Sequence, residues 1–164
     1  MNIDTLEKLY IHELKDLYSA ENQILDALPK MVRAASDADL VAALNGHVEQ
    51  TKAHRDRVTS LFETLDFEPG GHKCKGIEGL LKEASELLQE VTDDHVRDAA
   101  IISACQRVEH YEMAGYGVAR ALAKKLGRDT DVDTLTKTIE EEGAADRKLT
   151  ELAEHHINFV AQVN

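Results

Sequence analysis

Apolar residues recur at intervals of three or four along almost the whole chain, and nowhere do they alternate regularly with polar ones. This spacing gathers side chains on one face of an α-helix, whereas a half-buried strand needs a two-residue alternation. In the first segment the apolar stripe consists of Leu6, Leu9, Leu14, Leu17, Ile24, Leu28 and Met31. The periodicity therefore predicts an all-α protein.

Turn and capping residues divide the N-terminal half of this pattern into two helices. Asp4 is placed to cap the first helix, Pro29 lies inside it, and residues 36–39 predict a tight turn into the second. Because the connection is so short, the two helices should be antiparallel neighbours. The second apolar stripe consists of Leu40, Leu44, Val48, Thr51, Arg55, Val58 and Phe62.

The C-terminal half begins after the strongest helix breakers, at residues 68–71. A shorter helix is expected over residues 76–89, and the caps at residues 92–94 introduce a long helix that ends at Gly127. A last long helix follows through residues 129–157. Two long hairpins joined by a connection with its own helix form the plan of a ferritin-like four-helix bundle.

Length, charge and cysteine content narrow the class of protein further. The 164 residues fit a single domain over residues 1–164. A net charge of −12 without any cluster of Lys and Arg argues against nucleic-acid and anionic-membrane partners. No apolar stretch approaches membrane-spanning length, and Cys74 and Cys105 form no paired motif. We expect a cytoplasmic protein in a reducing compartment.

Acidic residues interrupt the apolar stripes on three of the four long helices. At about 100° per residue they project from the core-facing side, and most fall near the middle of their helix. His47 on the second helix lies at the same depth. The acids are Glu21 on the first helix, Glu109 and Glu112 on the third, and Glu142 and Asp146 on the fourth.

Several carboxylates that converge in an apolar core repel one another and lose hydration, which costs several kcal/mol per ion unless protons or cations compensate. A pair of metal ions held by carboxylate and imidazole ligands is the compensation that helical bundles use. Two simpler interpretations stay open. Any single acid could be an edge residue that reaches water, and His47 could be a hydrogen-bonded core histidine.

The chain resembles the bacterial stress-response proteins of the YciE/YciF type, a branch of the ferritin-like superfamily. The resemblance rests on the segments at residues 16–21, 108–112 and 140–142 with the following Asp146, on residues 74–80 of the crossover, and on residues 149–153. It covers essentially the whole chain. It implies a rubrerythrin-like four-helix bundle with an added helix, a homodimer, and a dinuclear iron or manganese centre that handles oxygen, peroxide or metal ions.

Residue by residue, the resemblance matches Glu21 to the first-helix carboxylate, Glu109 and Glu112 to the third-helix pair, and Glu142 to the fourth-helix carboxylate. In a dimetal site Glu112 and Glu142 would be bridging ligands, and Glu21, Glu109 and His47 would be terminal ligands. The pattern departs from the superfamily at two places: Ala145 stands where a His would follow Glu142, and Gln50 follows His47 where a Glu-x-x-His would be expected. Asp146 could substitute in one half of the site and His47 in the other. The alternative is a non-catalytic helical bundle that acts as an interaction protein, without a functional metal site.

Overall fold

The computed structural model describes residues 2–163, and every regular element among them is helical. The prediction of an all-α protein is therefore confirmed, and the short helix expected at residues 76–89 is present as α3. The elements are α1 (Leu6–Ala34), α2 (Ala38–Glu63), α3 (Lys75–Glu90), α4 (Asp94–Lys125), α5 (Asp129–Leu152), the π-helical turn η1 (Ala153–Ile157) and α6 (Asn158–Gln162).

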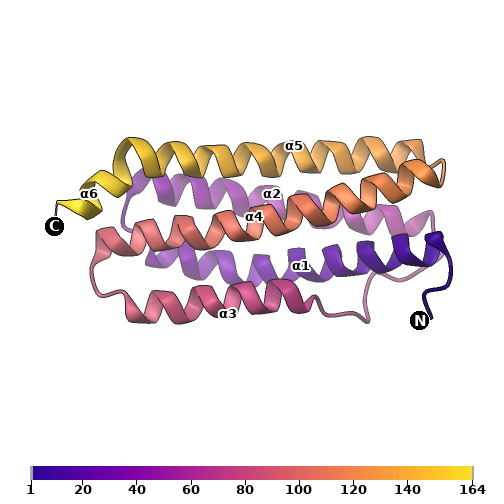
Figure 1. Ribbon diagram of the computed structural model, residues 1–164, viewed down its shortest axis with the longest axis horizontal. Coiled ribbons are helices and arrows are strands. Elements are labelled where there is room, and N and C mark those ends of the chain that lie inside the picture. Colours follow the sequence, from indigo (N-terminus) through magenta and orange to yellow (C-terminus); the bar gives the residue numbers. More distant parts are fainter. Residues whose placement is uncertain (1, 164) are drawn as a thin grey trace.

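The four long helices α1, α2, α4 and α5 lie side by side as a bundle, with α3 packed along its outside against α1 and α4 (Figure 1). The α1–α2 and α4–α5 pairs are antiparallel hairpins with short connections. The long connection that contains α3 carries the chain back along the bundle, so that α2 and α4 run in the same direction (Figure 1). This is the predicted two-hairpin arrangement.

Most of the helix boundaries follow from their capping residues. Asp37 and Asp93 cap α2 and α4 with side-chain oxygens that accept backbone N–H groups, and Gly127 adopts a φ of 72° just after α4. The predicted cap at Asp4 is wrong by one position. Thr5 caps α1, and Asp4 instead forms an ion pair with Lys8 at 2.6 Å.

The apolar core consists of two clusters, one toward each end of the bundle. Along α1, residues 10–17 belong to one cluster and residues 20–31 to the other, and the same division recurs on α2, α4 and α5. On each of these four helices the change of cluster falls at a buried polar residue. These residues are Glu21 on α1, His47, Thr51 and His54 on α2, Glu109 and Glu112 on α4, and Glu142 on α5. The bundle thus holds one polar layer between two apolar ends, as the matched depths predict.

Candidate metal centre

The polar layer contains two compact groups of potential metal donors. The first donor group is His47, Glu109, Glu112 and Glu142, and the second is Glu21, His54 and Glu142. Within each group, one donor atom from every residue lies within 4.8 Å of the corresponding atoms of the others. Glu142 belongs to both groups, so a single carboxylate connects two adjacent donor sets.

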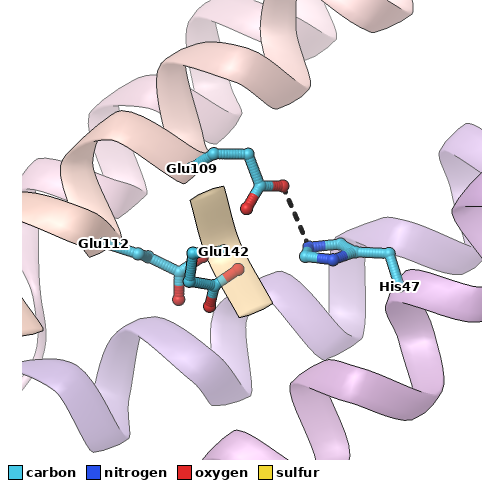
Figure 2. Close-up of side chains that lie close together, drawn as sticks. All are labelled: His47, Glu109, Glu112 and Glu142. Atoms are coloured by element: carbon cyan, nitrogen blue, oxygen red, sulfur yellow. Dashed lines mark ion pairs between the residues drawn. The ribbon is translucent and has the colours of Figure 1, made fainter. Parts of the chain in front are cut away.

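Figure 2 shows the first donor group, with side chains from α2, α4 and α5 directed toward one another. Glu109 and Glu112 are three residues apart on α4, which places them on one face of that helix. His47 Nε2 lies 3.0 Å from Glu109 Oε1 (Figure 2). All four side chains are buried, with at most 7% of any residue exposed.

The second donor group lies where α1, α2 and α5 face one another. His54 Nδ1 is 2.7 Å from Glu142 Oε1 and 3.8 Å from Glu21 Oε1. Tyr116, fully buried on α4, donates a short hydrogen bond from its hydroxyl to Glu21 Oε1. Tyr116 therefore fixes one oxygen of Glu21, and the other oxygen has no hydrogen bond.

The hydrogen-bonding capacity of these side chains is largely unused. Among the described residues, the buried side-chain nitrogen and oxygen atoms that lack a hydrogen bond all belong to the two donor groups: Glu21 Oε2, His47 Nδ1 and Nε2, His54 Nδ1, Glu109 Oε2, Glu112 Oε1, and Glu142 Oε1 and Oε2. His47 Nε2 and His54 Nδ1 come within ion-pair distance of a carboxylate but lack the direction of a hydrogen bond. An ion at the centre of each group would satisfy such atoms.

Other buried acids in the protein do have partners, which makes this contrast informative. Asp98 accepts the backbone N–H groups of Ser36 and Asp37 at 2.8 and 2.9 Å. Asp131 accepts the Tyr10 hydroxyl at 2.9 Å and also pairs with Arg128. Burial of an acid in this fold is therefore normally accompanied by donors, and unsatisfied oxygens concentrate in the polar layer.

Burial dominates the protonation of three of the glutamates. It raises the pKa of Glu21 to about 8, reinforced by the charge of Glu142, and raises the pKa of Glu109 to about 7 against the opposing effect of His47. The pKa of Glu112 is well above its usual range, because the residue is desolvated and faces three other carboxylates. Without a cation, this layer retains protons near neutral pH.

The pKa values of the two histidines are raised although burial alone would lower them. Desolvation alone would lower the pKa of His47, but its contact with Glu109 and the nearby acidic charges outweigh that effect and raise it to about 9. The pKa of His54 is raised for the same reason, mainly by Glu142. Glu142, for which burial would raise the pKa, is instead held below its usual value, chiefly by His54. The shared carboxylate is thus the most readily ionised acid of the layer.

The donor set suits a hard or borderline divalent ion. It consists of carboxylate oxygens and imidazole nitrogens, which bind iron and manganese, and includes no thiolate. His54 also has the supporting contact typical of a metal-bound imidazole: its Nε2 lies 2.9 Å from Glu141 Oε2, and Arg57 holds Glu141 through two hydrogen bonds. His54 Nδ1 is thereby directed at the second donor group. The residues present fit a dinuclear centre.

A family model matches nearly the whole chain, over residues 5–162. Its description is a domain of unknown function, DUF892. The chain belongs to the DUF892 family. Among its relatives is protein YciF of Escherichia coli strain K12, with 42% identity over 163 residues, which are 99% of this chain and 98% of YciF. The resemblance to YciF-type proteins is confirmed.

Solved structures of three other proteins share the arrangement described above. The crystal structure of the E. coli stress protein YciF has a TM-score of 0.89 at 42% identity and covers 95% of this chain and 99% of YciF. YcfI of Rhodopseudomonas palustris has a TM-score of 0.88 at 45% identity, covering 91% and 95% of the two chains. A Xanthomonas campestris protein at 16% identity, with a TM-score of 0.75 and 96% of each chain covered, shares the fold. None of the helices in the described part of this DUF892 protein has the length and apolarity to cross a membrane.

The structure brings together five of the six residues that the sequence indicates: Glu21, His47, Glu109, Glu112 and Glu142. Asp146 lies outside both donor groups. It is half-buried one turn after Glu142, where it accepts a hydrogen bond from Gln106 at 3.0 Å and lies 3.3 Å from His110. The helix rotates by about 40° over those four residues, which is enough to turn Asp146 toward α4 and away from the layer.

His54 is a donor that the ligand set predicted from the sequence of this DUF892 chain did not include. The predicted stripe on α2 included Arg55, but Arg55 is only half-buried and pairs with exposed Asp56, whereas His54 is fully buried. The signal is present in the sequence. His54 lies seven residues after His47 and three after Thr51, and it continues the three- and four-residue spacing of the stripe.

Proposed function

We propose that this protein is a ferritin-like metal-binding protein whose polar layer holds two iron or manganese ions, one in each donor group. The observation that carries the proposal is the position of Glu142, which belongs to two compact sets of unsatisfied donors at once. A carboxylate has two oxygens and can bridge two ions. Glu142 is the proposed bridge, with Glu112 beside it, and Glu21, Glu109, His47 and His54 are proposed terminal ligands.

A bound pair of such ions would supply redox and Lewis-acid chemistry toward oxygen or peroxide, or a place to hold the metal itself. The chain's residues prepare the site for this. Tyr116 orients Glu21, and Glu141 with Arg57 fixes the ring of His54. The apolar clusters flank the layer on both sides along the bundle. Because the related E. coli protein is called a stress protein, we propose that this protein also acts during stress.

The proposal includes a homodimer in the cytoplasm that contacts neither nucleic acid nor a membrane. The composition supports the absence of nucleic-acid and membrane partners, because a chain with 31 acidic and 19 basic residues repels polyanions and anionic lipid. Sedimentation velocity of the purified protein tests the dimer.

A second candidate is a non-catalytic helical bundle that serves as an interaction protein. It is favoured by the raised pKa values of Glu21 and Glu112, since a layer that retains protons can stay buried without any ion. Under this alternative, metal does not change the thermal stability of the protein.

Elemental analysis after reconstitution with iron or manganese separates the two candidates. If the dimetal proposal is right, the wild type should hold about two ions per chain. The Glu142→Gln variant, which changes the shared ligand, should lose both ions. Glu140→Gln is the matched control, because Glu140 is exposed on the same helix and should leave the metal content unchanged. Fewer than about 0.2 ions per wild-type chain would reject the metal site in favour of the second candidate.

A further inference from the structure

A pocket of about 320 Å³ opens between α2 and α5 and ends at the first donor group. Its deepest lining residues are buried and include His47, Glu109 and Cys105, whereas Ala42, Gly46, Ala144 and Lys148 on its rim are exposed. The pocket therefore connects the protein surface with two of the proposed ligands.

The walls of this pocket are built mainly from small residues. Alanines 42, 43, 144 and 145 and Gly46 occupy the two facing helices, so little side-chain volume fills the space between them. At Gly46 an added Cβ would meet nothing within 4 Å, which confirms that this part of the rim is open. The small residues keep a path between α2 and α5 that larger side chains would close.

The polar groups of the pocket point to the kind of molecule that it admits. Glu109 is the only acid among the lining residues, and it lies at the buried end, while Lys148 places a cation at the rim. In a chain of net charge −12, a path with a cation at its opening favours a small anion or neutral molecule over a metal cation. At the buried end of the pocket, His47 Nδ1 and Glu109 Oε2 have no hydrogen-bond partner.

Resting on the proposed function, we propose that this pocket is the access route by which a small anionic ligand, of the size of azide or hydroperoxide, reaches the ion held by the first donor group. The second donor group does not line the pocket, because neither Glu21 nor His54 is among its walls. The ligand would therefore meet the two ions unequally, and only the ion beside His47 and Glu109 would exchange ligands with solvent.

Azide is a suitable probe for the iron(III)-loaded protein, because its binding gives a charge-transfer absorption band. Ala145→Leu fills the pocket with a good helix former, and we expect azide affinity to fall at least tenfold while iron content stays at the wild-type value. Ala121→Leu is the matched control, an exposed alanine of α4 outside the pocket, and should bind azide normally. Lys148→Glu should slow azide association about tenfold at low salt and less at high salt.

Cys105 provides a readout that needs no metal, since it lines the same pocket. Its thiolate attacks methyl methanethiosulfonate to form a methyl disulfide and release methanesulfinate. Because burial raises the pKa of Cys105 to about 12, the reaction is followed at alkaline pH by peptide mass spectrometry. We expect labelling of Cys105 in the wild type, at least tenfold slower labelling in Ala145→Leu, and no reaction with a bulky aromatic disulfide.

These two readouts separate failure of the access route from failure of the proposed function. If the wild type binds no iron but Ala145→Leu still protects Cys105, the route is upheld as a pocket and the metal centre is rejected. If iron binds and azide affinity is the same in Ala145→Leu and wild type, the access route is overturned. Protection of Cys105 in the wild type also overturns it.

Discussion

Replacement of Glu112 by leucine should have opposite effects on the metal-free and the metal-loaded protein. Glu112 is 1% exposed, its pKa is raised by burial, and its Oε1 has no hydrogen bond. In the metal-free state it is a desolvated, unsatisfied acid among other acids. In the loaded state the proposal makes it a ligand. The same side chain is therefore a cost in one state and a stabilising contact in the other.

In the metal-free protein, three contributions set the change in the free energy of unfolding that Glu112→Leu causes. Removing an unsatisfied buried carboxyl group gains about 1–3 kcal/mol, and burying a leucine side chain gains about 1.5–3 kcal/mol. Misfit of the branched side chain costs about 1–3 kcal/mol. We expect Glu112→Leu to raise the free energy of unfolding by about 2 kcal/mol, which corresponds to an increase in Tm of about 4–8 °C for a chain of this size.

In the presence of metal the order should reverse. At a free metal concentration of 100 times Kd, binding adds about 2.7 kcal/mol to the stability of the wild type. Glu112→Leu loses most of this contribution because it lacks a ligand. Thermal unfolding of both proteins, with chelator and with added iron or manganese, measures the four Tm values from which the reversal is read.

Asp98→Leu is the control for replacement of a buried acid that has partners. Asp98 accepts two backbone N–H groups, so its loss should destabilise the protein by about 2–4 kcal/mol whether or not metal is present. A Glu112→Leu variant that behaves in the same way, less stable than wild type in chelator, would refute the reasoning. So would a variant whose Tm rises with metal as much as that of the wild type.

Of four further predictions, two concern pH, one concerns the second donor group and one concerns Asp146. The pKa values of Glu21, Glu109 and His47 are raised to about 8, 7 and 9, so between about pH 5 and pH 9 the metal-free folded state binds more protons than the unfolded state. The free energy of unfolding should therefore fall with rising pH, by about 1.4 kcal/mol per pH unit for each extra proton. Urea unfolding at several pH values measures this. Metal affinity, by contrast, should rise over the same range as protons leave the ligands, with proton release detectable by calorimetry in two buffers of different ionisation enthalpy. His54→Ala should reduce the metal content to about one ion per chain, measured by elemental analysis, whereas retention of both ions would remove His54 from the ligand set. Asp146→Asn should keep the wild-type metal content, and a loss of metal there would show that the two donor groups are drawn incorrectly.

The sequence predicts well where the helices lie and which residues share a depth along the bundle. Helix boundaries depend on nearby residues, and depth adds up by a constant rise per residue. Periodicity identifies each helix, and Asp37, Asp93 and Gly127 place the boundaries within a residue or two. The shared depth of Glu21, Glu112 and Glu142 follows from their distance to those boundaries, since each residue adds the same 1.5 Å rise. The structure adds the reason that this layer is sharp: two separate apolar clusters end against it.

Helix phase is harder to predict than depth, and the errors at the site all come from it. A shift of one residue turns a side chain by about 100°, so assigning Arg55 to the stripe of α2 hid His54 next to it. The difference between Glu142 and Asp146 is smaller and depends on the position of α4, through Gln106 and His110. For Glu142 and Asp146, the neighbouring helix α4 decides which residue faces the layer, and the sequence pattern of α5 alone does not contain that information.

An anomalous-difference map from crystals of the iron- or manganese-loaded protein tests the central claim most directly. We expect two peaks in the polar layer, one in contact with His47, Glu109 and Glu112 and the other in contact with Glu21 and His54. Both peaks should also be in contact with Glu142. A map without peaks in this layer at saturating metal, or with peaks only at surface carboxylates, would contradict it.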